Sequence, residues 1–133
     1  MTEIIKNARP RIYIAGPYSD PDPVKCDNNI KRASFVTAEL IIAGWAPFCP
    51  HNNTAHFEHV HPDIPYEAYI GLDLAWAECA QCALFLLGHK KSDGSRIEKK
   101  YFRTAKIPII YHNEPYCWSK LEKLRRKLCG EEV

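Results

Sequence analysis

The sequence predicts an α/β fold, in the form of a single-domain Rossmann-like or flavodoxin-like three-layer sandwich with a mainly parallel sheet. Short apolar runs rich in β-formers alternate along the chain with segments of helical periodicity. Strands that alternate with helices are joined by right-handed crossovers, which place parallel strands in the middle and helices on both faces. The 133 residues, of which 46% are hydrophobic and 26% charged, suit one globular domain.

The first β–α unit is expected to occupy residues 11–44. Arg11–Gly16 is a short β-rich run that ends on glycine, and a loop with three prolines follows it. Asp27 or Asn28 can cap the next helix, and Gly44 supplies its end. Helical spacing predicts that the apolar face of this helix contains Ala33, Val36, Leu40 and Ile41.

The middle of the chain predicts a second unit. A short strand is expected at Ala46–Cys49, and a polar loop rich in histidine continues to Pro65. Proline suits the first turn of a helix, so we expect a helix from Tyr66 to about Gln81. The apolar run Cys82–Leu87 predicts a third, buried strand.

The last third of the chain completes the alternation. Residues 88–94 are expected to form a loop, followed by a helix from about Ser95 to Ala105. Ile107–Tyr111 predicts the fourth strand, and a basic helix is expected at Trp118–Cys129. Residues 1–133 are then one domain, in which residues 1–10 form a loose amino-terminal extension.

Charge and hydropathy exclude several classes of partner. The formal net charge of +2 is too small for a nucleic-acid footprint or an anionic membrane surface. The longest apolar stretches fall far short of the roughly 20 residues that a membrane span needs. The amino-terminal residues lack the apolar run of a signal peptide. We therefore expect a cytoplasmic protein with reduced cysteines and with no nucleic acid and no membrane as partner.

Candidate site residues lie where the predicted strands end. In parallel sheets, ligands bind beyond the carboxyl ends of the strands, near the point where the strand order reverses. This rule selects the segments 16–19, 50–61, 88–98 and 112–114. In the first of them, Gly16 has no side chain and lets the backbone approach a ligand closely.

The segment Ser92–Glu98 has two interpretations. It leads a glycine-containing loop into a helix, whose first turn presents unpaired N–H groups to an anion. That anion could be a phosphate or the carboxylate of Glu98, which the helix dipole would hold in the ionised form that a nucleophile needs. Alternatively, Ser95 caps the helix and Glu98 reaches back to its amide in a capping box.

Two clusters of metal-binding or redox-type residues have simpler explanations. The spacing in the histidine-rich loop matches no familiar metal site, and an irregular loop enforces no geometry, so we expect a base-binding lid and no metal. The residues concerned are His51, His56, Phe57, Glu58, His59, His61 and Asp63. Cys79 and Cys82 form a C-x-x-C pattern at the end of a helix, where buried packing thiols are favoured over a redox pair.

Four motifs occur in the order and spacing of a known family. They are Tyr13-Ile-Ala-Gly-Pro-Tyr-Ser19, Pro47-Phe-Cys-Pro-His51, Asp73 and Asp93-Gly-Ser-Arg-Ile-Glu98. Together they resemble the nucleoside 2-deoxyribosyltransferase superfamily, including its deoxynucleotide N-hydrolase relatives and short phage-type members. The resemblance covers roughly residues 11–111.

The resemblance implies an enzyme that cleaves the N-glycosidic bond of 2′-deoxynucleosides or their 5′-monophosphates. Glu98 matches the nucleophile, which attacks C1′ of the sugar and forms an ester that a second base or water resolves. Asp73 matches an acid that contacts the sugar or assists departure of the base. Tyr13 matches a tyrosine that orients the nucleophile. No cofactor is implied, because carboxylates and positioning suffice.

The deoxynucleoside or deoxynucleotide is expected to contact eight residues. These substrate-binding residues are Gly16, Pro17, Tyr18, Ser19, His51, Ser92, Gly94 and Ser95. No arginine stands beside the first glycine turn to hold a phosphate, although Arg96 could reach one. Relatives form homo-oligomers in which a neighbour completes the pocket, so a homo-oligomer is expected, and His112 and Asn113 could serve that purpose.

The chain departs from the family pattern at Gln81, where relatives often have an aspartate, and in its histidine-rich loop. Both departures concern specificity for the base or sugar more than the type of reaction. The sequence leaves transferase and hydrolase activity unresolved. An alternative from another class is a non-catalytic nucleotide-binding or sensor module of the same fold.

Overall fold

The computed structural model describes residues 9–131 as a three-layer α/β structure; residues 1–8 of the expected extension lie outside the described residues. The described part contains a four-stranded, wholly parallel sheet with the order β2-β1-β3-β4. Its strands are β1 (Arg11–Ala15), β2 (Ala46–Phe48), β3 (Cys82–Phe85) and β4 (Ile109–Tyr111). The predicted fold class is therefore confirmed, with a strand order that agrees with the flavodoxin-like arrangement.

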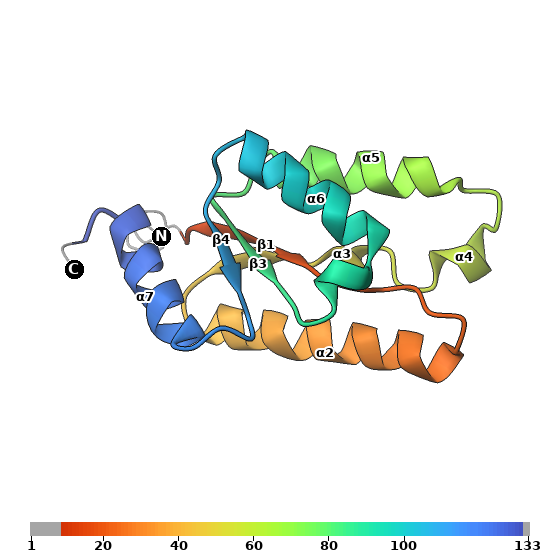
Figure 1. The fold of residues 1–133 in the computed structure, drawn as a ribbon, viewed down its shortest axis with the longest axis horizontal. Helices are drawn as coiled ribbons and strands as arrows, with labels where there is room; N and C mark the ends of the chain where they lie inside the picture. Colours follow the sequence, from red (N-terminus) through yellow and green to blue (C-terminus); the bar gives the residue numbers. More distant parts are fainter. Residues whose placement is uncertain (1–8, 132–133) are drawn as a thin grey trace, which may run out of the picture.

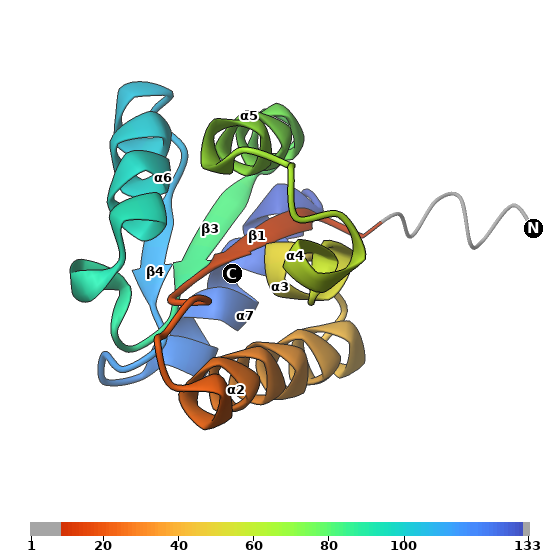
Figure 2. The same cartoon turned by 90° about the vertical axis from the view of Figure 1, so that its right-hand side faces the viewer.

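Helices cover both faces of the sheet (Figure 1). α2 (Pro23–Ile42) and α7 (Cys117–Leu128) pack on one face, and α5 (Tyr66–Ala77) and α6 (Asp93–Thr104) pack on the other. Figure 2 shows the layers from the end of the molecule, with α5 and α6 above the strands and α2 below them. No helix within residues 9–131 is long and apolar enough to cross a membrane.

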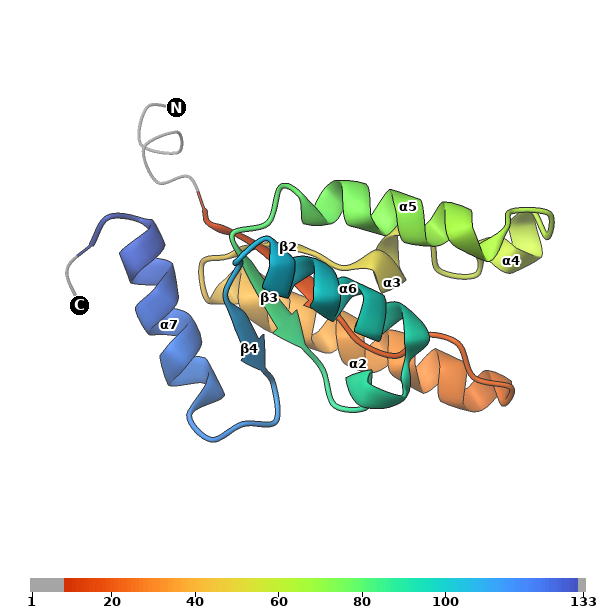
Figure 3. The same ribbon diagram turned by 45° about the horizontal axis from the view of Figure 1, so that its top comes forward.

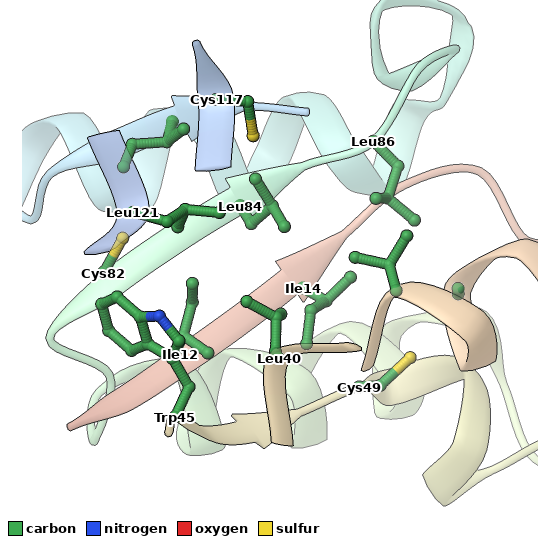
Figure 4. Close-up of a cluster of buried hydrophobic side chains, with 13 residues drawn as sticks. Ile12, Ile14, Leu40, Trp45, Cys49, Cys82, Leu84, Leu86, Cys117 and Leu121 are labelled. Atoms are coloured by element: carbon green, nitrogen blue, oxygen red, sulfur yellow. The ribbon is translucent and has the colours of Figure 1, made fainter. Parts of the chain in front are cut away.

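Alternation along β1 determines which side chains each face receives. Ile12 and Ile14 join the apolar cluster beneath α2 and α7, which Figure 4 shows in close-up. Tyr13 and Ala15 point to the opposite side, toward α5 and α6. The tyrosine of the first motif therefore lies on the face that carries α6 and Glu98.

The first helix begins earlier than the sequence predicts. α2 starts at Pro23, and the side chain of Asp22 caps it by accepting a hydrogen bond of 2.9 Å from the N–H of Val24. Proline at the first helical position needs no amide partner, so the proline-rich loop ends sooner than expected. The predicted caps at Asp27 and Asn28 are wrong for this reason. Of the predicted apolar face, Ala33, Val36 and Leu40 are buried, whereas Ile41 is 49% exposed.

The histidine-rich segment is more ordered than a loop. It contains the short helices α3 (Pro50–Asn53) and α4 (Phe57–Val60), and His56 between them has a left-handed φ of 61°. The remaining elements match their predictions, but with shifted ends. α5 ends at Ala77, β3 ends at Phe85 and β4 begins at Ile109, so each is shorter than predicted. The loop after β3 contains one 3₁₀ turn, η1 (His89–Lys91).

All six cysteines are free thiols. Cys82 lies in the apolar cluster under α2 and α7, where burial raises the pKa of its thiol to about 12. A thiol that stays protonated is a poor nucleophile, so the packing interpretation holds for Cys82. Cys79 is exposed, and the prediction that it is buried is wrong.

Candidate active site

A cavity of about 1000 Å³ opens at the carboxyl ends of the strands. The strand order reverses between β1 and β3, since the chain goes from β1 to β2 on one side and returns to β3 on the other. The loops that leave these two strands lie at the same end of the molecule (Figure 3). A Cβ atom on Gly16 would lie 3.0 Å from Cβ of Leu86, so glycine is what allows the two strand ends to approach here. The cavity has the size and position of a small-molecule site.

Ten of the eleven predicted site residues line this cavity. They are Gly16, Pro17, Tyr18, Ser19, His51, Asp73, Ser92, Gly94, Ser95 and Glu98. They come from the loop after β1, from α3, from α5 and from the start of α6 with its preceding turn. Tyr13 is fully buried behind Glu98 instead. The fold thus gathers the predicted set around one cavity, and the roles of its members stay predictions.

Tyr13 and Glu98 form a buried pair at the base of the cavity. The Tyr13 hydroxyl donates a hydrogen bond to Oε2 of Glu98, and the glutamate is only 6% exposed. Phe102, one turn further along α6, packs against the Tyr13 ring with centroids 5.3 Å apart and fixes the helix on the strand. The phenol therefore both orients the carboxyl group and favours its ionised form.

The capping-box interpretation is wrong. Ser92, not Ser95, is the cap of α6, and its hydroxyl oxygen accepts a hydrogen bond of 3.2 Å from the N–H of Ser95. Glu98 lies in the second turn of α6 and turns inward to Tyr13 instead of back to the helix start. The reason for the shift is that Gly94, expected in a loop, lies within the first turn of the helix.

Burial controls the protonation of both carboxyl groups in the cavity. It raises the pKa of Glu98 to about 8, with a further contribution from the charge of Asp73 and an opposing one from the Tyr13 hydrogen bond. Burial alone raises the pKa of Asp73 to about 6. The expectation that the helix start keeps Glu98 ionised is wrong, because Glu98 lies beyond the first turn and desolvation outweighs the dipole.

Glu98 and Asp73 interact, so they titrate as a pair rather than as two separate groups. Between pH values of about 6 and 8, given by their two pKa values, the pair holds one proton. A carboxylate and a carboxylic acid then face the same cavity at neutral pH. Because Asp73 has the lower pKa, the proton lies mainly on Glu98, and attack by Glu98 needs the less populated form in which that proton is on Asp73.

Unpartnered polar atoms are concentrated at this cavity. Buried polar groups in proteins are normally hydrogen-bonded, so each exception needs an explanation. Within residues 9–131, the buried side-chain atoms without a partner that belong to cavity-lining residues are Arg32 Nε, His51 Nδ1, Tyr69 Oη, Asp73 Oδ1 and Ser95 Oγ. A polar ligand, or ordered water in its place, would complete these bonds.

His51 offers the cavity a hydrogen-bond acceptor. Its Nε2 lies 2.8 Å from the carbonyl oxygen of Pro17, which can only accept, so Nε2 carries the proton. Burial lowers the pKa of the imidazole and keeps it neutral. Nδ1 is therefore left with a free lone pair, which a ligand hydroxyl or amine could use.

Sequence reasoning missed two cationic residues, Arg32 and Lys91, that line the cavity. Arg32 of α2 donates a hydrogen bond of 2.9 Å to the carbonyl oxygen of Leu87 and so stands beside the end of β3. The sequence signal that could have identified Arg32 is its position next to buried Ala33, at the edge of the apolar face of the helix. Arg96, which the sequence offered as an alternative contact for a phosphate, pairs with Asp93 on the surface and does not line the cavity.

The histidine-rich segment forms the mouth of the cavity. His56, Glu58 and His59 line it, but Phe57 and His61 do not, so the prediction that Phe57 covers the site is wrong. Aromatic walls come instead from Tyr18, Tyr66 and Tyr69. The ligand atoms of His56, Glu58 and His59 lie within 4.8 Å of one another, which is close enough to hold a metal ion.

Two other sequence candidates lie elsewhere. Two hydrogen bonds join Gln81 to the backbone of Arg11 at the amino ends of the strands. The N–H of Arg11 donates to the side-chain oxygen of Gln81 over 3.0 Å, and the N–H of Gln81 donates to the carbonyl oxygen of Arg11 over 2.9 Å. The departure from the family pattern at Gln81 therefore has a structural role, remote from the cavity. His112 packs edge-on against Trp118, and neither it nor Asn113 lines the cavity of its own chain.

These features define a class of protein: a parallel α/β domain in which a buried glutamate and a half-buried aspartate line a cavity at the point where the strand order reverses. Residues 10–112 match the model of a family described as a domain of unknown function, DUF7768, and the chain belongs to that family. No curated protein matches the chain at a significant level.

Proposed function

We propose that this protein cleaves the N-glycosidic bond of 2′-deoxynucleosides or their 5′-monophosphates, with Glu98 as the nucleophile. The observation that carries the proposal is the buried Tyr13–Glu98 pair, which lies with Asp73 at a cavity of ligand size. The motifs that resemble the nucleoside 2-deoxyribosyltransferase superfamily supply this set of residues. Their convergence from three separate elements supports the resemblance.

In the proposed reaction, an oxygen of Glu98 attacks C1′ while the bond from C1′ to the base breaks. The electron pair of that bond passes to the base nitrogen, and Asp73 supplies a proton to the base or contacts the sugar. The resulting glycosyl ester is resolved by water, which gives hydrolysis, or by a second base, which gives transfer. Tyr13 holds the attacking carboxylate in place through its hydroxyl. The proposed chemistry uses no metal or organic cofactor.

The 5′-monophosphate is the better supported form of the substrate. Arg32 and Lys91 place positive charge on the cavity wall, and the first turn of α6 presents its N–H groups there. Ser95 adds a buried hydroxyl without a partner. A nucleoside without phosphate would leave these groups unused.

The proposed homo-oligomer is supported by α5. This helix carries only two charged residues, Glu67 and Asp73, yet among its twelve residues only Ala77 is buried. A helix that is apolar on all sides normally lies inside a protein. A Cβ atom on Gly71 would meet nothing within 4 Å, so this mid-helix glycine has no packing reason within the chain.

A second copy of the chain is the occupant that best fits this exposed face of α5. Its members are Ala68, Gly71, Leu72, Ala75 and Trp76, with the exposed Glu67 at its edge. A twofold contact places a surface against itself, so a face whose centre carries no charge limits like-charge repulsion, and small residues at that centre allow two helices to approach closely. We propose a homo-oligomer built on this face, in the cytoplasm, that acts on a small molecule rather than on nucleic acid or membrane.

A non-catalytic nucleotide sensor is the second candidate. The observation that favours it is the pKa of about 8 for Glu98, which leaves that carboxyl group largely protonated at neutral pH. Such a group would bind a ligand by hydrogen bonds without attacking it. Both candidate functions include binding of the nucleotide, but only the enzyme converts it.

The decisive experiment incubates the protein with each deoxynucleoside and 5′-deoxynucleotide, with and without an acceptor base, and measures free base by chromatography. The proposed function predicts base release that Glu98→Gln abolishes and that Glu67→Gln, an exposed carboxylate on α5, leaves intact. A chelator should not change the rate, whereas a metal-dependent hydrolase would stop. Ligand binding without any base release would establish the sensor instead.

A further inference from the structure

The geometry points to a second site, a transition-metal site of the zinc type formed by His56, Glu58 and His59 at the mouth of the cavity. The three side chains offer two imidazole nitrogens and one carboxylate oxygen within 4.8 Å of one another. This donor set is typical of zinc in proteins, whereas Mg²⁺ and Ca²⁺ prefer oxygen ligands alone. The inference concerns binding only and does not rest on the proposed reaction.

The local fold explains why the three residues converge. His56 adopts a left-handed backbone conformation immediately before α4, which contains Glu58 and His59 in adjacent positions. The rings of His56 and His59 lie nearly parallel, with centroids 6.0 Å apart. In a tetrahedral zinc site, ligand atoms lie about 3.3 Å apart, given zinc–ligand bonds of about 2.0–2.2 Å. Small rotations of these exposed side chains would bring the ligand atoms to that separation.

A fourth ligand is available from another element. Oδ1 of Asp27, in α2, lies 3.6 Å from Nε2 of His56. Asp27 also lines the cavity. With this carboxylate the set contains two histidines and two acids, and the ion would link α4 to α2.

Tyr18 orients the proposed ligands. Its hydroxyl lies 3.1 Å and 3.2 Å from the two carboxylate oxygens of Glu58, to which it donates, and it accepts a hydrogen bond of 2.8 Å from the N–H of His56. Metal sites commonly have such partners, which fix the direction of a ligand before the ion arrives. One side chain from the loop after β1 therefore holds the carboxylate of Glu58 and the backbone at His56.

Glu58 and His59 lie in a helix, α4, and not in the irregular loop that led us to expect no metal. The ion has no step in the proposed cleavage of the glycosidic bond. It would join the segment around α4 to α2 at the cavity mouth, so zinc binding should restrain that mouth. We expect zinc to stabilise this segment.

The test uses the full chain without substrate. Titration calorimetry with zinc chloride should show one ion per chain, and thermal unfolding should shift upward with zinc and not with magnesium. His56→Ala and His59→Ala should each weaken zinc binding by about tenfold or more, since even partners behind the ligands are worth about 10–100-fold. His61→Ala, a change to an exposed histidine beside the same helix, should bind zinc like the wild type. Circular dichroism confirms that each variant is folded.

Three results would overturn the inference. The first is equal weakening by His61→Ala, and the second is unchanged binding in the double variant His56→Ala/His59→Ala. The third is loss of binding on replacing the exposed thiols, Cys79→Ser and Cys129→Ser, which would assign the ion to the cysteines. Glu98→Gln should retain zinc binding, so failure of the proposed reaction and failure of this site are separate outcomes.

Discussion

The two faces of the sheet differ in what they bury. Beneath α2 and α7, the cluster around Ile12, Leu40 and Leu84 consists of hydrophobic side chains, Trp45 and three thiols among them, and contains no charged group (Figure 4). Beneath α5 and α6, the buried groups include a phenol and a carboxyl group, Tyr13 and Glu98. Burial of apolar side chains stabilises a fold, whereas burial of a carboxyl group opposes its ionisation. The face under α2 and α7 therefore stabilises the fold. The face under α5 and α6 holds the reactive groups and is less stable because of them.

One substitution on each face of the sheet should separate an effect on activity from an effect on stability, and these are the largest changes that we expect. Tyr13→Phe removes the hydroxyl that orients Glu98 and should lower base release by about 10²-fold with little change in stability. Leu40→Ala leaves a cavity in the opposite core and should cost about 2–5 kcal/mol in the free energy of unfolding, with specific activity retained. Chemical denaturation and initial rates measure both quantities. Equal loss of activity in the two variants would contradict the assignment of activity to one face of the sheet and stability to the other.

The pH dependence of base release tests the carboxyl pair. The reaction needs one proton on the pair, a state that exists between the pKa values of about 6 for Asp73 and about 8 for Glu98. The rate should therefore be highest near pH 7 and fall about tenfold per pH unit on either side. In Asp73→Asn the alkaline limb should disappear, because only the ionisation of Glu98 then controls the rate. A rate independent of pH from 5 to 9 would argue against carboxyl catalysis.

The free energy of unfolding should also depend on pH, because Glu98 is buried on this face of the sheet. The pKa of Glu98 is raised to about 8 by folding, so its neutral form stabilises the protein fully below its ordinary value of 4.5, and that contribution is lost as the pH rises through 8. Glu98→Gln keeps a neutral side chain at every pH. It should be more stable than wild type at pH 9 by about 1–3 kcal/mol, and similar to it at pH 4. Thermal melts of both proteins across this range measure the difference.

The smallest effect expected is on the outer surface of α5. Leu72→Glu places a charge on the exposed side of α5 and should convert the proposed oligomer to a monomer without unfolding it. Ile42→Glu, on α2, introduces the same charge at an 87% exposed residue on the other side of the sheet and should leave the mass unchanged. Light scattering with gel filtration gives the mass. A monomeric wild type, or dissociation by Ile42→Glu alone, would disprove the α5 contact.

Strand positions could be predicted because buried parallel strands have a simple sequence pattern. The run Cys82–Phe85 is completely buried, and its neighbour β1 is buried from Ile12 to Ala15, whereas only Ile110 is buried in the edge strand β4. Helix starts were harder to predict from the sequence, because they depend on which of several polar side chains bonds to a backbone amide. Asp22 rather than Asp27 caps α2, and Ser92 rather than Ser95 caps α6. These choices follow from tertiary packing.

The candidate site was predicted as far as motifs and strand ends allow. Glu98, Asp73 and the loop after β1 do surround one cavity. The sequence could not show that Glu98 is buried deeply enough for its pKa to rise, because burial depends on Tyr13 and Phe102 packing around it. Nor could it place Arg32, which reaches the cavity from the helix after β1.

The limited burial of α5 makes the protein suitable for changing ligand preference by mutation. Tyr66, Tyr69 and Ile70 form one wall of the cavity, and none of them belongs to the apolar clusters that hold the sheet together. A library at these three positions would vary the shape offered to a base while keeping the carboxyl pair and the sheet constant. Gly16 should be excluded from such a library, since any larger side chain there would meet Leu86 and separate the strand ends.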